Sequence, residues 1–437
     1  MGISAFPSGL QAIIQQGFLE REFQEGLRSR LGFRAIADRE AFPAAIGETI
    51  TKTRKGLKAP VTTPLNPAGN TNLDNGLSPS GWTVEQYSLG VNMYGDTIDL
   101  NMVTSRVGIS GQFLKNANTN GIQAMQSLDR LARDTLFGGY LGGNTRVTVT
   151  LGSPDVSVAV DDIRGFRNVL VNGVLVPVSG AHVLTAVIGS STYSVSGAAA
   201  DVINVSTAPG GVSGVLTLTS NVSVSDATAG HAVVAATAPS VKRPLGRATT
   251  ADIVASDTLT MGDVLAAVAD LRSNNVPPVS ESGLYHCQID DRQLLGLFKD
   301  DDFKMLYRGA YASETYKNGQ IIDLMGVRFI PTNEAPQQSL NGVVVHRAIV
   351  CGQGAIIEGD LTEVGYSDIG LPDALKVMVD DVCMVTREPI DRLQQIVAQS
   401  WYWIGGFALP TDATANTLII PTATNSYYKR AVVIESA

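Results

Sequence analysis

Histidine and cysteine, the side chains that most often act as nucleophiles, bases and metal ligands, are sparse in this sequence. Its 437 residues include four histidines and three cysteines, and no histidine lies at metal-ligand spacing from another. Motifs of the form HExxH, GxSxG and GxxxxGK(S/T) are absent. The residues concerned are His182, His231, His286, His346, Cys287, Cys351 and Cys383. We therefore predict no catalytic residues and no bound cofactor, and we interpret His286 as a strand residue.

Acidic side chains cluster at three places where a divalent cation could find oxygen ligands. The clusters are Asp290-Asp291, Asp300–Asp302 and Asp380-Asp381. Because adjacent strand residues point to opposite faces, we interpret the clusters as helix caps and solvated loops and predict no metal site. The segment Gly352–Ile357 begins like a dinucleotide-binding fingerprint, but its last residue is Ile where the third glycine is needed.

Composition favours a folded protein that is covered by neighbours. Hydrophobic residues make up 44% of the chain, charged residues make up 17%, and 44 residues are glycine. So few charges leave much neutral surface, which is typical of subunits covered by their own copies, although a glycine-rich monomer would give the same numbers. The net charge of −9 argues against a dedicated DNA-binding surface, which needs clustered lysine and arginine. It remains compatible with a container whose wall binds DNA weakly.

Signals for secretion or membrane insertion are not found in the sequence. The N-terminus lacks the basic region and apolar run of a signal peptide, and no stretch approaches the roughly 18 apolar residues of a membrane span. The cysteines are widely spaced and predict no disulfide framework. We therefore expect a soluble protein, made in the cytoplasm, with no membrane partner.

Residues 9–31 repeat apolar side chains at helical spacing, and Gly32 follows them as a stop signal. Two interpretations of this amphipathic arm stay open. Either the helix folds back onto the core of its own chain, or the arm lies across a neighbouring subunit. In the second case Phe18, Phe23 and Arg28 are the predicted contacts.

Residues 47–96 are predicted to form one long hairpin with β-prone segments at both ends. The intervening residues 59–81 contain four prolines and three glycines, and so long a loop is usually functional or disordered. Four cations lie along the first strand, where they either blunt a solvated strand edge or mark an arm that docks on an acidic neighbour. These predicted intersubunit contacts are Lys52, Arg54, Lys55 and Lys58.

Residues 111–141 carry the strongest helical pattern, with apolar side chains at spacings of three and four. Gly142-Gly143 follows directly and marks the end of the predicted helix. A helix of about 30 residues is roughly 45 Å long at 1.5 Å per residue, which is enough to brace a large, thin domain.

Residues 145–247 differ abruptly from the rest of the chain. Between Asn168 and Val241 the only charged side chains are Asp201 and Asp226. Short alternating runs are separated by Gly, Ser and Pro turns at close intervals. This pattern predicts an inserted all-β domain of about 100 residues.

From residue 252 onward the pattern is mixed α/β. Thr260 and Asp263 are predicted to form a capping box at the start of a helix, and Asp290 is expected to cap a short helix. A hairpin is predicted to turn near Gly326. The remaining predicted strands are 284–289, 342–350, 374–386 and a last strand near 418–421.

The order of these parts resembles that of the major capsid proteins of tailed phages, whose shared fold is named after phage Hong Kong 97. In that family an N-terminal arm precedes an extended E-loop, a long spine helix crosses a peripheral domain, and an axial domain completes the subunit. Three stretches are similar to capsid sequences: Tyr94–Asp99, Ser127–Arg133 and Leu324–Pro331. The resemblance covers nearly the whole chain except residues 145–247, which look like the insertion domains of some capsid subunits.

This resemblance implies an α+β fold of the HK97-like class with an inserted all-β domain. Its implied parts are an N-terminal arm (1–46), an E-loop hairpin (47–96), a peripheral part with the spine helix (97–144), the inserted domain (145–247), an axial domain (248–390) and a C-terminal return to the peripheral and axial core (391–437).

The function implied by the resemblance is structural, not enzymatic. The chain would self-assemble into pentamers and hexamers of an icosahedral shell around the double-stranded DNA of a tailed phage, without sequence-specific DNA binding. Its implied location is the virion, after assembly in the bacterial host cytoplasm. Other implied partners are a portal, decoration proteins and a separate scaffolding protein, since no charge-rich coiled-coil segment precedes the arm. Lys58 is a candidate for the Lys–Asn crosslink of some members. An encapsulin-like container and a phage tail or adhesion protein are the alternatives.

Overall fold

A computed structural model of the chain describes most of its residues, which fold into two compact units. The described residues are 18–28, 32–41, 49–64, 81–82, 84–101, 109–201, 204–279, 283–309, 323–324, 326–360, 376–389, 392–393, 395–412, 414 and 417–437. Unit 1 draws on residues 1–50, 88–133 and 356–408, and unit 2 draws on residues 51–87, 134–355 and 409–437. Each unit is therefore built from three separate stretches of sequence.

The longest element is helix α3 (Ile109–Tyr140), which has 32 residues and confirms the predicted long helix. Its apolar stripe is buried, for example at Phe113, Leu128 and Leu136, each 0% exposed. The helix ends where the Gly142-Gly143 pair was predicted to end it, and Gly143 has a φ of +83° that favours glycine. At 1.5 Å per residue the helix is about 48 Å long.

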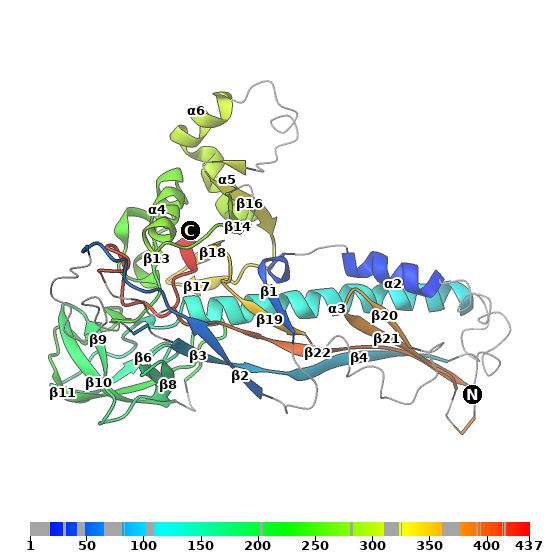
Figure 1. The fold of residues 1–437 in the computed structure, drawn as a ribbon, viewed down its shortest axis with the longest axis horizontal. Helices are drawn as coiled ribbons and strands as arrows, with labels where there is room; N and C mark the ends of the chain where they lie inside the picture. Colours follow the sequence, from blue (N-terminus) through cyan, green and yellow to red (C-terminus); the bar gives the residue numbers. More distant parts are fainter. Residues whose placement is uncertain are drawn as a thin grey trace. The chain divides into compact units, whose positions relative to one another are not determined.

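Unit 1 is a six-stranded sheet covered by helices. Strand β22 (Ile396–Ala408) is central and pairs antiparallel with β4 (Asn92–Asn101) from Ile396↔Asn101 to Gly405↔Asn92. Apart from β4, the strands lie in the order β1 (Asp38–Ala41), β19 (Ile357–Asp360), β22, β21 (Val382–Arg387) and β20 (Lys376–Val379). Helix α3 runs along this sheet, and the shorter helix α2 (Phe18–Arg28) lies beside α3 (Figure 1). The core between helices and sheet contains Phe23, Leu128, Trp401 and Trp403.

One expectation for this region needs correction. The stretch 374–386, predicted as one strand, forms the hairpin β20–β21, which turns at Asp380 and Asp381 with positive φ angles of 45° and 73°. Two central residues with positive φ are typical of a type I′ turn. Residues from Ile356 to Ala408 belong to unit 1, and the predicted axial domain, 248–390, stays a prediction.

The inserted segment in unit 2 forms its own closed sheet. The strand order is β5 (Asn144–Arg146), β12 (Ala232–Ala235), β9 (Leu184–Ile188), β10 (Ser191–Ala200), β11 (Gly214–Val222) and β6 (Asp155–Val160). An antiparallel bridge between Val147 and Val160 joins the two outer strands, so the sheet closes on itself. Alternating side chains such as Leu184, Ala186 and Ile188 point inward and are nearly inaccessible. A separate hairpin, β7 (Asn168–Val171) and β8 (Val174–Pro177), completes this domain.

The rest of unit 2 is a seven-stranded α/β layer. Its strand order is β13 (Val241–Lys242), β23 (Ala431–Ser436), β18 (Val343–Cys351), β14 (Tyr285–Asp290), β16 (Val327–Thr332) and β15 (Asp323–Leu324), with β17 (Gln338–Leu340) on β18. This part of unit 2 also contains the helices α4 (Met261–Ser273), α5 (Asp291–Lys299) and α6 (Asp301–Gly309). Single 3₁₀ turns occur at Arg34–Ile36 in unit 1 and at Pro244–Gly246 and Thr250–Asp252 here.

Local signals in this layer were predicted better than long-range ones. The capping box of Thr260 and Asp263 is present at the start of α4, and the predicted turn at Gly326 joins β15 to β16. Asp290 does occupy the N-cap position of α5, but its side chain does not cap the helix. No strand forms at 418–421; the last strand is β23, ten residues further on.

The mixed α+β class predicted from the sequence is confirmed by these two units. Among the helices that the structure describes, none is both long and apolar enough to cross a membrane.

Candidate functional site

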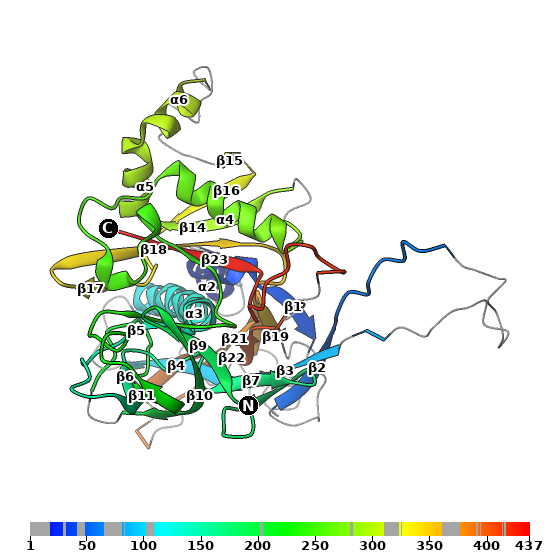
Figure 2. The ribbon, with the colours of Figure 1, turned by 90° about the vertical axis from the view of Figure 1, so that its left-hand side faces the viewer.

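The basic hairpin is built from strands β2 (Thr49–Lys55) and β3 (Val84–Gly90), which pair with each other. Alternation along β2 places Lys52 and Arg54 on one half-buried face and Lys55 on the opposite, exposed face. Lys58 follows the strand and is exposed. Beyond β2 the chain leaves the strand pair in an extended course up to residue 64 (Figure 2). The loop residues 65–80 lie outside the described part of the chain.

Apolar side chains accompany these cations, and sequence analysis missed them. Leu57 is 48% exposed, Val61 is 83% exposed and Trp82 is 48% exposed. The Lys55 ammonium lies 5.6 Å from the centre of the Trp82 ring, at a distance typical of a cation–π contact between the two sides of the hairpin. Exposed aromatic and aliphatic side chains next to cations are typical of a surface that binds another protein. The available signal was the presence of Leu57 and Val61 within an otherwise polar, Pro-rich stretch.

The base of this hairpin is fixed by the inserted domain. The Gln86 amide donates a hydrogen bond of 2.8 Å to the carbonyl of Gly173, at the turn between β7 and β8. Gly173 has a φ of +81°, and a Cβ atom there would lie 2.1 Å from the Val84 carbonyl oxygen. Only glycine therefore permits this close approach. The Leu170 amide also donates to the Tyr427 hydroxyl, at 2.8 Å, which links the β7–β8 hairpin to the C-terminal segment.

The N-terminal arm folds back onto its own chain over the residues described. Leu19 and Phe23 of α2 are buried in the unit 1 core, and the Asn118 side chain donates a hydrogen bond to the Glu22 carbonyl. A Cβ atom at Gly26 would lie 2.5 Å from the Asn118 carbonyl oxygen, so the two helices are in close contact at this position. This geometry favours the first of the two interpretations of the arm.

The structure places the three arm residues that were predicted as intersubunit contacts in different environments. Phe23 is 0% exposed and packs within its own subunit, which corrects the prediction for that side chain. Phe18, at the start of the same helix, is 45% exposed and remains available to a neighbour. Arg28 is the last residue of α2, and its side chain lies outside the described part of the structure.

The segment after α2 is anchored by buried polar groups. Amides of Gly32 and Arg34 donate to Asp129 Oδ1 of α3, at 3.2 and 3.0 Å. The Arg34 guanidinium pairs with Glu358 through Nε at 3.1 Å and Nη2 at 2.5 Å, and both side chains are almost fully buried. Arg34 also lies over the Trp403 ring, 5.8 Å from its centre. A charged contact of this kind specifies where the arm leaves the subunit core.

The titratable groups that sequence analysis singled out are not assembled into a reactive centre in the described structure. His346 contacts Asp290 on the neighbouring strand β14, which explains why Asp290 does not cap α5. Burial raises the pKa of the Cys287 thiol to about 12 and raises that of Cys351 further, so both thiols are protonated at neutral pH. No group of three or more potential metal ligands occurs among the residues that the structure describes.

Comparison with solved structures finds phage capsids, the class that the sequence resemblance named. The capsid of Ralstonia phage GP4 matches over 93% of this chain and 88% of its own, with 11% identity and a TM-score of 0.49. The capsid asymmetric unit of cyanophage Pam1 covers 94% of each chain, with 11% identity and a TM-score of 0.48. The mature capsid of bacteriophage PhiM1 covers 93% of this chain and 87% of its own, with 5% identity and a TM-score of 0.45.

No protein-family model matches the sequence, and no curated protein matches it. Because the three TM-scores are below 0.5, the structural likeness carries no argument about function.

Proposed function

We propose that this chain is the major capsid protein of a tailed double-stranded DNA phage. Copies of it assemble into the pentamers and hexamers of an icosahedral shell that encloses the genome. A separate scaffolding protein, a portal and decoration proteins are its further partners, and its role is structural, not catalytic. Assembly takes place in the host cytoplasm, and the finished protein resides in the virion.

The observation that carries this proposal is the basic hairpin and its exposed apolar side chains. Val61 and Trp82 are exposed and lie beyond the ends of strands β2 and β3, whose base is fixed through Gln86 and Gly173. Burying such side chains would stabilise the protein by roughly 25 cal/mol for each Å² of apolar surface removed from water. A neighbouring subunit that covers them would recover this free energy, and its acidic groups would pair with Lys55 and Lys58. The chain's net charge of −9 makes an acidic acceptor on another copy available.

Unit 1 is assembled from distant parts of the sequence, and this also supports a role as a shell subunit. Helix α3 braces a sheet whose strands come from distant parts of the sequence, and Arg34 holds the arm against that sheet. We expect such a unit to keep its fold when neighbouring subunits bind its edges. In a closed shell many modest contacts add up, so that no single contact needs to be strong.

Replacing Arg54, Lys55 and Lys58 together by alanine tests the electrostatic part of the proposal. We expect a folded subunit by circular dichroism that assembles slowly or not at all, because the attraction to an acidic neighbour is lost. Wild-type assembly should also slow in about 1 M salt, where charges are screened within about 3 Å. Assembly is followed by light scattering and electron microscopy.

The matched control replaces three cations outside the hairpin, Lys115, Arg292 and Lys304, by alanine. This variant removes the same net charge and should assemble normally. Normal particles from the hairpin variant would contradict the electrostatic contact. Particles that form without DNA in a phage-free host, and never package it in the presence of a portal, would favour an encapsulin-like container.

A further inference from the structure

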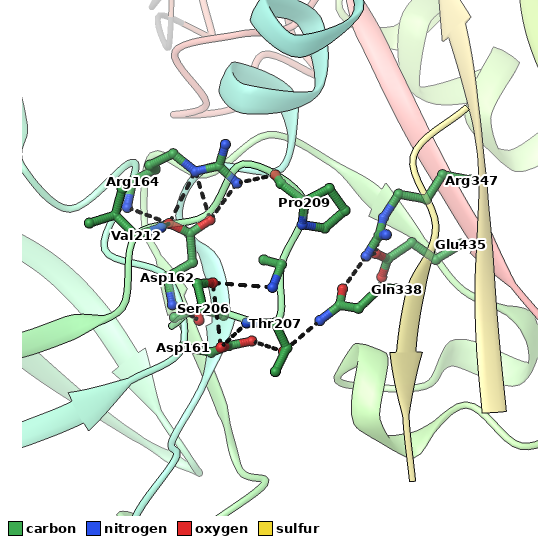
Figure 3. A network of polar contacts seen from close by, with 12 residues as sticks. Asp161, Asp162, Arg164, Ser206, Thr207, Pro209, Val212, Gln338, Arg347 and Glu435 are labelled. Carbon is green, nitrogen blue, oxygen red and sulfur yellow. Dashed lines mark hydrogen bonds and ion pairs between the residues drawn. The ribbon is translucent and has the colours of Figure 1, made fainter. Parts of the chain in front are cut away.

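A chain of polar contacts joins the inserted domain to the α/β layer within unit 2 (Figure 3). Asp161 accepts a hydrogen bond of 2.8 Å from the Thr207 amide, and the Thr207 hydroxyl accepts one of 2.9 Å from the Gln338 side chain. Gln338 in turn accepts from Arg347, whose Nε donates to Glu435 at 2.9 Å. The five residues come from both parts of the unit; Thr207 is exposed, whereas Asp161, Gln338, Arg347 and Glu435 are buried.

A small hollow of about 30 Å³ lies at this seam. Residues of the inserted domain, including Arg146, Asp161 and Asp162, line one side. Thr249, Arg347 and Glu435 of the α/β layer line the other. A volume of this size holds a ligand of one or two atoms, since about 10–15 Å³ is the least that a water molecule needs.

Hydrogen-bond donors remain unused around this hollow. Arg347 Nη1 and Arg146 Nε are buried and have no partner among the described residues. The Thr249 hydroxyl is buried and donates to no described group, while its oxygen accepts within a capping box with Asp252. Arg347 is 1% exposed, so water outside the fold cannot reach it freely. A buried donor without a partner costs about 1–3 kcal/mol, and native proteins rarely leave one empty.

The carboxylates of the hollow have already used their acceptor capacity. Both oxygens of Glu435 are engaged, Oε1 by Arg347 and Oε2 by Arg243 and Thr250. Asp162 accepts from Arg164 through both oxygens and from the Val212 amide. Asp161 accepts from Thr207 and lies 3.7 Å from Arg146. The groups left over are donors, so the occupant that suits them is an acceptor.

The charges of the network point the same way. Four guanidinium groups, those of Arg146, Arg164, Arg243 and Arg347, face three buried carboxylates, those of Asp161, Asp162 and Glu435. The next carboxylate, Asp252, bonds the Thr249 amide and is exposed to solvent. The cluster therefore carries one more positive than negative charge, although the Arg146 and Arg164 side chains are 21% and 18% exposed, and a bound anion would compensate this charge.

We propose that the hollow binds one small monovalent anion of the size of chloride, held by Arg347, Arg146 and Thr249. The anion fills the hollow, accepts from the unused donors and neutralises the cluster. It thereby fastens the inserted domain to the α/β layer. This site is a property of one subunit and does not depend on shell formation.

Halide titration of the full-length protein tests the proposal. The melting temperature is measured while potassium gluconate is replaced by potassium chloride, and then by bromide, at constant ionic strength. We expect a saturable rise with either halide, because a ligand of the folded state stabilises it by mass action. Line broadening of the ³⁵Cl resonance reports the same binding directly.

Variants assign the effect to the hollow. Thr249→Val removes one donor at constant shape and should raise the half-saturating chloride concentration roughly tenfold. Arg347→Gln should abolish the halide effect. Thr217→Val, at an exposed position of β11, is the matched control and should behave like the wild type. If Arg347→Gln does not fold, Arg146→Lys, which keeps the charge and loses the Nε donor, takes its place.

Two results would overturn the anion site. A melting temperature that does not depend on the identity of the anion would mean that the hollow holds water only. A halide effect that persists unchanged in Thr249→Val and in the arginine variant would place the bound anion elsewhere on the protein.

Discussion

At the scale of single residues, buried ion pairs hold segments that are far apart in sequence. Arg34 and Glu358 are 324 positions apart, yet they form a bidentate contact with side chains that are 7% and 1% exposed. Two desolvated charges stabilise little compared with apolar residues of the same shape, but removing one partner leaves the other charge unpaired. Such a pair therefore acts mainly to specify position.

Arg34→Met should accordingly destabilise unit 1 by about 3–5 kcal/mol, because Glu358 is left buried without its partner. Arg39→Met is the matched control: Arg39 pairs with Asp381 but is 55% exposed. Its loss should cost no more than about 1 kcal/mol, as is usual for surface pairs. Urea unfolding of both variants gives the comparison. Equal losses would show that the buried pair does not fix the arm.

Glu435 is predicted to make stability dependent on acid. Burial alone would raise its pKa, but Arg243 and Arg347 outweigh burial and lower it from 4.5 to about 2. A carboxyl group with a depressed pKa stabilises the folded state fully above its unfolded pKa, and this contribution is lost as pH falls from about 4.5 to about 2. The melting temperature of Glu435→Gln should therefore be lower at neutral pH and should fall less steeply over that window. A parallel pH profile in both proteins would exclude this role.

At the scale of elements, the contact between helices α2 and α3 decides where the arm lies. Gly26 has no space for a side chain against the Asn118 carbonyl and the backbone of Gly121. Gly26→Leu should separate the helices, expose Phe23 and increase proteolysis near the arm. The control is Gly111→Ala in α3, where no atom lies within 4 Å of the added Cβ. That change should stabilise the helix by roughly 0.5–1 kcal/mol. Equal protease resistance in Gly26→Leu and the wild type would contradict the packing described.

The elements also show which features are readable from sequence. The capping box of Thr260 and Asp263 and the length of α3 were predicted, because both depend on neighbouring residues. Strand β23 was missed, because its pairing with β13 and β18 involves residues at least 80 positions away. Asp290 was predicted to cap helix α5, but its carboxylate contacts His346 on another strand instead.

The sequence also could not predict which apolar side chains of one helix are exposed and which are buried. Phe18 and Phe23 are both apolar residues of one helix, and only the packing of α2 on α3 distinguishes the exposed ring from the buried one. The cations of the hairpin were predicted as intersubunit contacts, and that role stays a prediction. Their apolar companions, Leu57, Val61 and Trp82, became visible only through their exposed fractions.

At the scale of the whole molecule, the proposed shell explains why so neutral a chain carries an exposed hairpin. With 17% charged residues, the surface has few groups that oppose burial by further copies. The hairpin concentrates cations and exposed apolar side chains on one element, and its base is fixed by Gly173. Under the proposed function, a neighbouring copy would cover this element.

Electron microscopy of the purified protein, alone and with its candidate scaffolding protein, shows whether the chain forms shells. The proposed function predicts closed, icosahedral shells in at least one of the two conditions, with every subunit's hairpin covered by another copy. Monomers in both conditions, at concentrations where the folded protein is stable, would contradict it.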